Sequence, residues 1–420
     1  MKSKQTKDIV KKIIAVLLFL LVFFLCTLYI MRTTKDKANY IKYQQFYEEN
    51  ENFDVLFFGS SRILDAVYPM ELWDEYKLTS YNMAQHSEGL NVSYWQMKNA
   101  FEHNTPKVAV VDLSLLRGGK IGNESRESLS YLHKSLDHIP FSKLKYDALV
   151  DLTEGVDIWE YMVPYAMYHN RWNDLDHVDF YMEDYPLRKG AESRVFIRPL
   201  ESVEWSSQEI ATFLNIESIR LQEMVTLCEE YGVELVFTLM PTIESSANPD
   251  FCSLINAIQV FADENGIPLV NFAKEDDFLN YATDFSDTSH LNPSGGKKLT
   301  SKMGQFLVEK YCFETKNEMT VKAWEQAWNV YMGTKLGELM SEAKEGDLNC
   351  YMMLLNDEDY KVEIHMPEEH DMEQLGLASL LEDLDEIQES IVYDMKEQVI
   401  EIMVYREDTG ELLHQAKFAR

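Results

Sequence analysis

Five short apolar runs, separated by helical patterns, constrain the fold of this chain most strongly. They read FDVLFF (53–58), TSYNMA (79–84), KVAVVDL (107–113), VELVFTLM (233–240) and IPLVNF (267–272). Between and after them, apolar residues recur with helical spacing over 88–103, 206–231, 250–265 and 293–311. Continuous apolar strands that alternate with helices are typical of a parallel sheet covered on both faces. We therefore predict a doubly wound α/β domain over residues 51–312.

Two regions depart from this alternation. Residues 114–205 are rich in aromatic side chains and predict a helical insertion over the carboxyl edge of the sheet. After a helical linker over 313–345, residues 350–366 and 391–419 alternate like strands. A hairpin is expected to turn at Asp408-Thr409-Gly410. The sequence thus predicts a small α+β module over 346–420. Its segments 357–369 and 375–384 resemble small lectin-like domains, and a scaffold or partner-docking domain is the alternative.

An apolar segment precedes the α/β region. Residues 13–31 read IIAVLLFLLVFFLCTLYIM, which is just long enough to cross a hydrocarbon core of about 30 Å as a helix. Five lysines precede it, which predicts a cytoplasmic tail over 1–12 and an extracellular remainder. A cleaved signal peptide is the alternative, but no small-residue cleavage site follows. We expect a single-pass plasma-membrane protein in which residues 32–50 form a juxtamembrane helix or spacer.

Charge and cysteine content exclude several classes of function. The formal net charge is −32, and a chain so acidic is not expected to bind nucleic acid, because phosphate contacts need a basic surface. The five cysteines are scattered without a CxxC pair, so neither a disulfide framework nor a zinc site is predicted. No other motif in the sequence indicates a metal or a cofactor.

Two polar segments are expected to meet at the carboxyl edge of the sheet. Gly59-Ser60-Ser61 follows the first strand, and Asp287 stands three residues before His290 in the loop ahead of the last helix. A serine hydroxyl needs a base within hydrogen-bond reach, and the base needs a third group to fix its tautomer. Ser61, His290 and Asp287 are therefore the predicted nucleophile, base and orienting carboxylate.

At these residues the chain resembles the SGNH/GDSL hydrolase superfamily. FGSSR (58–62), YNMAQHSEG (81–89) and DTSHLNPSGG (287–296) are similar to its first, second and fifth sequence blocks. The resemblance implies an SGNH-type fold, with Ser61 as nucleophile and the backbone N–H groups of Ser61 and Ala84 in the oxyanion hole. The chain departs from the family where Ser60 replaces an aspartate and where VVDLSLL (110–116) lacks the third-block asparagine.

The anchor, the Asp-x-x-His pair and His-Asn-Arg-Trp (169–172) make the chain similar to one branch, the DltD-like and alginate O-acetyltransferase-like proteins. That resemblance implies an acyl-serine, which we expect to be an acetyl-serine formed with a multi-spanning MBOAT-type partner, and transfer to a cell-surface or cell-wall polysaccharide. Substrate contacts are expected from Arg62, Asn82, His169 and Arg171, although a surface ion pair or internal packing would also explain the charged ones. A carbohydrate esterase or deacetylase, and an inactive scaffold that binds glycan or the acyltransferase, are the alternatives.

Overall fold

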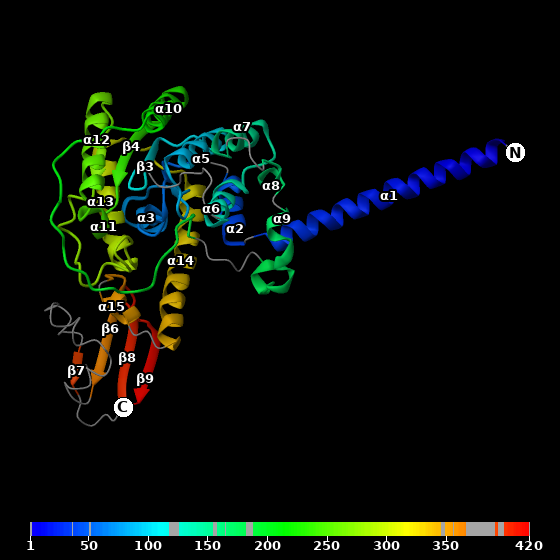
Figure 1. Cartoon of the computed structure of the whole chain (residues 1–420). Coiled ribbons are helices and arrows are strands. Elements are labelled where there is room, and N and C mark those ends of the chain that lie inside the picture. Colours follow the sequence, from blue (N-terminus) through cyan, green and yellow to red (C-terminus); the bar gives the residue numbers. More distant parts are fainter. Residues whose placement is uncertain are drawn as a thin grey trace. The chain divides into compact units, whose positions relative to one another are not determined.

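The computed structural model describes residues 2–35, 37–49, 52–116, 126–153, 158–163, 165–181, 188–345, 349–355, 357–366, 391–393 and 399–419. The chain divides into two compact units (Figure 1). Unit 1 comprises Met1–Glu48 and Ile121–Tyr185, and unit 2 comprises Glu49–Lys120 and Pro186–Arg420. Parts of the predicted insertion and of the predicted C-terminal module, including residues 367–390, lie outside the described residues.

The sheet of unit 2 is parallel, as predicted. Its order is β2-β1-β3-β4-β5, and its strands are β1 (Val55–Phe58), β2 (Ser80–Asn82), β3 (Val108–Asp112), β4 (Glu234–Leu239) and β5 (Leu269–Asn271). The chain leaves β1 toward β2 on one side and reaches β3 on the other. In open α/β sheets, ligands bind beyond the carboxyl ends of the strands at such a reversal of strand order. The residues directly after β1 therefore occupy the position where a site is expected.

Helices follow the strands in the predicted order. They are α3 (Ser61–Leu64), α4 (Pro69–Tyr76), α5 (Leu90–His103), α10 (Asn215–Tyr231), α11 (Ile243–Ser246), α12 (Pro249–Asn265) and α13 (Pro293–Lys310). The helix predicted over 206–231 begins only at Asn215, which corrects its start. Residues 206–214 are not helical, because their backbone is bound elsewhere: Ser206 N–H donates to Ser246 O and Ala211 N–H donates to Ser253 O.

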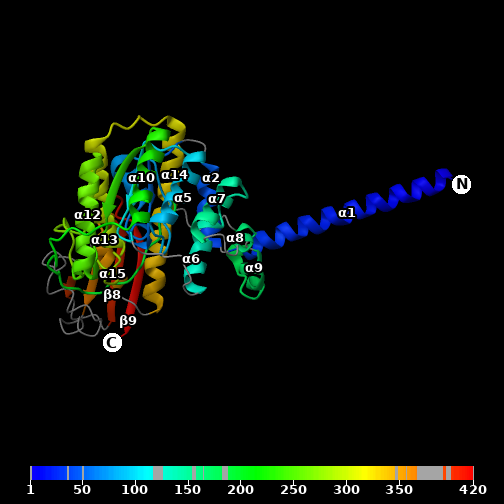
Figure 2. The same cartoon turned by 45° about the horizontal axis from the view of Figure 1, so that its top comes forward.

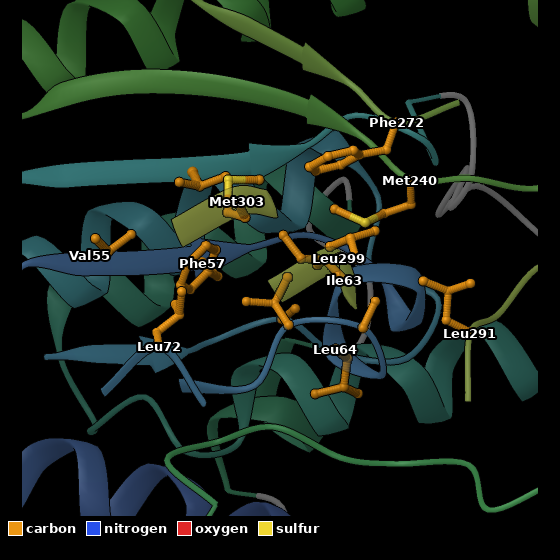
Figure 3. Close-up of a cluster of buried hydrophobic side chains, with 14 of the residues drawn as sticks. Val55, Phe57, Ile63, Leu64, Leu72, Met240, Phe272, Leu291, Leu299 and Met303 are labelled. Atoms are coloured by element: carbon orange, nitrogen blue, oxygen red, sulfur yellow. The ribbon is translucent and has the colours of Figure 1, made fainter. Parts of the chain in front are cut away.

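One buried cluster holds the first strand, α3, α4 and α13 together. Figure 3 shows part of it, with Val55 and Phe57 of β1 among side chains from the other elements. Leu299 and Met303 of α13 are fully buried in the same cluster, as is Ile63 of α3. Burying a side chain of this size stabilises the fold by roughly 1.5–3 kcal/mol. The cluster thus fixes the short helix α3 against the end of β1.

The C-terminal part of unit 2 is a second sheet preceded by two helices. α14 (Glu318–Glu345) and α15 (Asn349–Leu355) lead into a sheet of order β7-β6-β8-β9. Its strands are β7 (Ile391–Tyr393), β6 (Tyr360–Met366), β8 (Val399–Arg406) and β9 (Leu412–Ala419). The hairpin predicted at 408–410 joins antiparallel β8 and β9, with Gly410 at φ +67°. The strand expected from residue 350 is wrong in its first part, because the apolar run at 350–354 forms α15 and is buried on all sides of that helix.

Buried ion pairs connect this C-terminal part to the α/β core. Lys335 Nζ of α14 lies 3.0 Å from Glu71 Oε1 of α4 and 2.5 Å from Asp357 Oδ2. Lys297 Nζ of α13 lies 2.6 Å from Asp357 Oδ1. Burial opposes the charge of Lys335, but the carboxylates of Glu71 and Asp357 raise its pKa well above the ordinary value. The ammonium group of Lys335 is therefore charged inside the protein, and this charge is stabilised by the two carboxylates.

The regular elements among the described residues of unit 1 are all helices. They are α1 (Lys2–Thr34), α2 (Lys37–Glu48), α6 (Arg126–Leu136), α7 (Lys143–Thr153), α8 (Ile158–Met162), α9 (Tyr165–Tyr168), and the 3-10 helices η1 (His169–Asn173) and η2 (His177–Asp179). In Figures 1 and 2, α1 extends away from the other helices of the unit. Its segment Ile9–Thr34 is long and apolar enough to cross a membrane, and no residue of its most apolar 18-residue window is buried in the protein. At 1.5 Å per residue these 26 residues span about 39 Å.

Candidate active site

The backbone after β1 makes a sharp turn that presents Ser61. Gly59 has φ +137°, a conformation that residues with a side chain rarely adopt, and a Cβ atom there would lie 2.8 Å from Asp112 Cβ. Helix α3 then begins at Ser61, and the Ser60 hydroxyl caps it by accepting from Arg62 N–H at 3.3 Å. Ser60 is buried and Ser61 is partly exposed. The turn therefore has a structural serine first and an accessible serine second.

A carboxylate at the end of β3 supports this turn. Ser60 Oγ donates to Asp112 Oδ2 at 3.1 Å, and Ser114 N–H donates to Asp112 Oδ1 at 2.9 Å. Burial raises the pKa of Asp112 although the hydrogen bonds from Ser114 and Ser60 oppose that effect. Ser60 stands where the resembled family has an aspartate, and here the acid comes from the neighbouring strand. An aspartate that ends an apolar strand, as in VAVVD, is the sequence signal that could have identified it.

The loop before α13 is held by its own hydrogen bonds. Ser286 N–H donates to His290 O at 3.0 Å, and Phe285 pairs with Leu291 in an isolated antiparallel bridge. Asn292 caps α13 by accepting from Gly295 N–H at 3.2 Å. These bonds close the loop into a compact turn with Asp287 and His290 on it, so both side chains are positioned by backbone structure.

The structure brings Ser61, His290 and Asp287 into one hydrogen-bonded chain. Ser61 Oγ lies 2.8 Å from His290 Nε2, and His290 Nδ1 lies 2.9 Å from both carboxylate oxygens of Asp287. Burial opposes ionisation of Asp287, but Ser289 N–H, His290 and Arg194 outweigh it, so the pKa of this carboxyl is lowered. An ionised Asp287 accepts the Nδ1–H of His290, which leaves Nε2 to accept the proton of Ser61. This arrangement matches what a serine nucleophile requires.

Arg194 adds a cation to this site, and the sequence alone did not indicate it. Arg194 Nη1 lies 3.5 Å from Asp287 Oδ2, and Arg194 Nε lies 2.5 Å from Asp65 Oδ2. Asp65 is buried just after α3, and burial raises its pKa against the opposing charge of Arg194. Arg194 lies in a segment without regular secondary structure, so no periodicity or motif could have placed it beside Asp287.

Of the two predicted oxyanion donors, Ser61 N–H lies at the start of a helix and Ala84 N–H is hydrogen-bonded within the protein. Ser61 N–H is in the first turn of α3, where backbone N–H groups have no acceptor within the helix. Ala84 is fully buried, and its N–H donates to Asn82 Oδ1 at 3.2 Å. The expectation for Ala84 is therefore corrected, because its N–H is taken up inside the turn. Ser61 N–H is the predicted donor whose position suits an oxyanion.

Three of the four predicted substrate contacts have partners within their own unit. Asn82 is fully buried, and its amide donates to Ile63 O and Val67 O at 3.0 Å, so it supports the turn of Ser61 and does not line a surface. Arg62 Nη1 donates to Ser114 O at 2.8 Å. Arg171 belongs to unit 1, where its guanidinium binds Thr34 O, Lys35 O and Asp179, so its role in substrate binding stays a prediction. The side chain of His169 lies outside the described residues.

Comparisons with known proteins give the chain no family. No protein-family model matches it. No curated protein matches it either. Among solved structures, it is similar to a protein from Desulfitobacterium hafniense described as lipolytic and of the G-D-S-L family, with 10% identity, a TM-score of 0.32, and coverage of 61% of this chain and 100% of that one.

A second solved structure is a protein from Bacteroides fragilis described as an acylhydrolase. Identity to it is 11% and the TM-score is 0.35, with 66% of this chain and 99% of that one covered. Because these identities and TM-scores are low, the function proposed below rests on the geometry of the site itself.

Proposed function

We propose that this chain is a membrane-anchored, serine-dependent acyltransferase that acetylates hydroxyl groups of a cell-surface or cell-wall polysaccharide. The observation that carries the proposal is the hydrogen-bonded chain of Ser61, His290 and Asp287 at the carboxyl edge of a parallel sheet. Ser61, Asp287 and His290 belong to sequence blocks that resemble those of SGNH-type enzymes, as does the block around Tyr81.

In the first half of the reaction, Ser61 Oγ attacks the carbonyl carbon of an acyl donor. His290 Nε2 takes the hydroxyl proton, and Asp287 stabilises the imidazolium through Nδ1–H. The negative charge that develops on the carbonyl oxygen faces Ser61 N–H at the start of α3. His290 returns the proton to the leaving group, which departs and leaves an ester on Ser61.

In the second half, a sugar hydroxyl replaces the leaving group. His290 removes its proton, the alkoxide attacks the acyl-serine, and Ser61 regains its proton from His290. The donor in this proposal comes from an MBOAT-type multi-spanning partner, as the sequence resemblance implies. The apolar helix α1 supports anchoring beside such a partner, with the N-terminus in the cytoplasm and unit 2 outside the plasma membrane.

A carbohydrate esterase is the second candidate. The side chains of His290 and Asp287 are 15% and 34% exposed, so water can reach the base. An acyl-serine at this position would then be open to hydrolysis. Transfer and hydrolysis share the first half of the reaction and differ only in the acceptor.

A partition experiment tests the proposal. The full chain in detergent is incubated with an activated acetyl ester, with and without acetyl-free acceptor oligosaccharides, and both free acetate and acetylated sugar are measured. Acetylated sugar that depends on Ser61 supports the transferase, whereas acetate release that ignores the acceptor supports the esterase. If Ser61→Ala keeps wild-type surface acetylation in cells, the transferase is wrong, and if it also keeps wild-type acetate release from the ester, the esterase is wrong too. Ser218→Ala serves as the control, because it removes an exposed serine hydroxyl from α10 and leaves the turn that presents Ser61 intact.

A further inference from the structure

We propose that the segment of unit 1 over residues 165–181 lies in the headgroup layer of the bilayer crossed by α1, with Trp172, Phe180 and Tyr181 in contact with lipid. We call these three side chains and the backbone that carries them the interfacial face. The proposal concerns a lipid surface and goes beyond the anchoring helix itself. It rests on the proposed anchoring by α1 and is independent of the catalytic chemistry of Ser61.

Hydrogen bonds tie this segment to the end of the apolar helix. Arg171 Nη1 donates to Thr34 O at 3.1 Å and also to Lys35 O. Thr34 is the last residue of the segment that is long and apolar enough to cross a membrane. Helix η1 also contacts α1 directly. Trp172, the next residue after Arg171, is therefore held at the depth where the apolar helix leaves the hydrocarbon.

Contacts within the segment 165–181 fix its other residues relative to Arg171, and therefore relative to the end of α1. Arg171 Nη2 lies 3.3 Å from Asp179 Oδ1, and Asp179 is almost fully buried. Asp176 and Asp179 form a capping box at η2, with Val178 N–H donating to Asp176 Oδ1 at 2.8 Å. These contacts connect η2 to Arg171 and through it to the end of α1.

Large aromatic side chains are exposed on this segment. Trp172 is 67% exposed, and Phe180 and Tyr181 are each 52% exposed. Three such side chains, close together in the chain, are costly to leave in water, and clusters of this kind mark interaction surfaces. Trp and Tyr are enriched where proteins meet the headgroup region, because one part of the ring system is apolar and another is polar. Their composition therefore fits a bilayer interface.

Cationic side chains at the same end of α1 suit the phosphate layer. Lys35 follows the apolar segment directly and, with Lys134 and the carboxylate of Asp137, lines a hollow of about 280 Å³ in unit 1. Arg32 lies within the last turn of α1. Positively charged side chains beside aromatic ones are typical of segments that lie on anionic lipid. Depth and aromatic exposure thus indicate the same occupant, a lipid bilayer, whereas the exposed Asp174 and Asp176 leave the segment without a net positive charge.

The test uses the full chain in nanodiscs of phosphatidylcholine and phosphatidylglycerol, part of it brominated near the headgroup end of the acyl chains. Bromine quenches the fluorescence of tryptophan on contact. We expect the brominated lipid to quench wild-type emission, and Trp172→Phe to lose a clear part of the quenched signal. Trp324→Phe is the matched control: it also removes one indole, but Trp324 is buried in unit 2 and lipid cannot reach it.

A labelling measurement separates this inference from the anchoring on which it rests. Cys26 and Cys312 are both exposed on the protein surface, but only Cys26 lies on the apolar helix. If α1 is in the bilayer, a membrane-impermeant maleimide labels Cys312 and spares Cys26. Labelling of both would overturn the anchoring and the interfacial face together. A spared Cys26, with equal quenching in wild type and Trp172→Phe, would overturn the interfacial face alone, as expected for a surface that binds a protein partner.

Discussion

Arg194 Nη1 lies 3.5 Å from Asp287 Oδ2, which places a guanidinium charge beside the carboxylate that orients His290. The same guanidinium also pairs with the buried Asp65, since Arg194 Nε lies 2.5 Å from Asp65 Oδ2. The residues that follow run into the C-terminal core, where Ile197 is buried and Val195 packs against it. Asp287 is thus braced by a segment that is itself anchored in the second sheet of unit 2.

Replacing Arg194 by glutamine is expected to lower kcat by up to about 100-fold with little change in KM, since a misplaced catalytic group can cost that much. The arginine charge helps to lower the pKa of Asp287, so its loss raises that pKa. The acid limb of the pH–rate profile should therefore move to higher pH. Steady-state kinetics on an activated acetyl ester across pH would measure both effects.

Arg198→Gln is the matched control for this prediction, because it removes an exposed arginine from the same segment. Arg194→Lys should restore part of the activity, since an ammonium group keeps the charge but not the two-sided contact. An Arg194→Gln profile that falls in rate without any shift in pH would contradict a direct effect on Asp287. If the wild type turns over no ester, ¹³C NMR titration of the Asp287 carboxyl in both proteins still measures this effect.

Asp287→Asn should keep the fold and lose about 10⁴-fold in kcat, the loss seen when the acid of a serine protease triad is changed in this way. The asparagine amide would present a donor to His290 and disturb the tautomer that accepts the Ser61 proton. Kinetics on the activated ester, with circular dichroism as the check on folding, would test it. Activity within a few-fold of wild type would mean that His290 does not depend on Asp287.

Gly59→Ala should be far more damaging than Gly232→Ala, although both glycines have positive φ. At Gly232 a Cβ would meet nothing within 4 Å, so the cost is the backbone conformation alone, about 1–2 kcal/mol. At Gly59 the Cβ would also lie 2.8 Å from Asp112 Cβ, and the turn that presents Ser61 would have to shift. Urea unfolding of both variants would compare them, and equal destabilisation would contradict the close approach of the turn to β3.

The strands and most helices could be predicted because each is a local pattern. A continuous apolar run such as VAVVD predicts a buried parallel strand wherever it lies, and the pairing of Ser61 with His290 follows from both residues standing at carboxyl ends. The N-terminal limit of α10 could not be predicted, because residues 206–214 also permit a helix. Only their distant hydrogen bonds, such as that between Ser206 and Ser246, hold them extended.

In the site too, residues within local motifs could be predicted, whereas residues placed by tertiary structure could not. Ser61, His290 and Asp287 belong to short motifs with fixed spacing, so the sequence indicates them. Arg194 lies beside Asp287 only because an irregular segment crosses the site in the folded chain, and no local sequence pattern predicts the course of that segment. Ala84 and Asn82 stand at the expected places in the chain, but their roles depend on where Asn82 Oδ1 points, which is decided by burial.

Lys335→Met should destabilise the chain by about 3–5 kcal/mol, because it leaves the carboxylates of Glu71 and Asp357 buried with one partner fewer. The C-terminal sheet should loosen first, since these pairs connect it to α4. Lys361→Met is the control, because that lysine pairs with Glu363 at an exposed position and should change little. Chemical unfolding would give the two stabilities, and a neutral Lys335→Met would show that packing alone holds the sheet.

The central claim is that Ser61 carries the acyl group, and mass spectrometry of the trapped intermediate tests it most directly. The full chain is mixed with an activated acetyl ester, quenched in acid within the first turnover, and digested. The account predicts one added acetyl group on Ser61, retained in Ser60→Ala and absent in Ser61→Ala and His290→Ala. Acetylation of another residue, or product formation by Ser61→Ala at the wild-type rate, would contradict it.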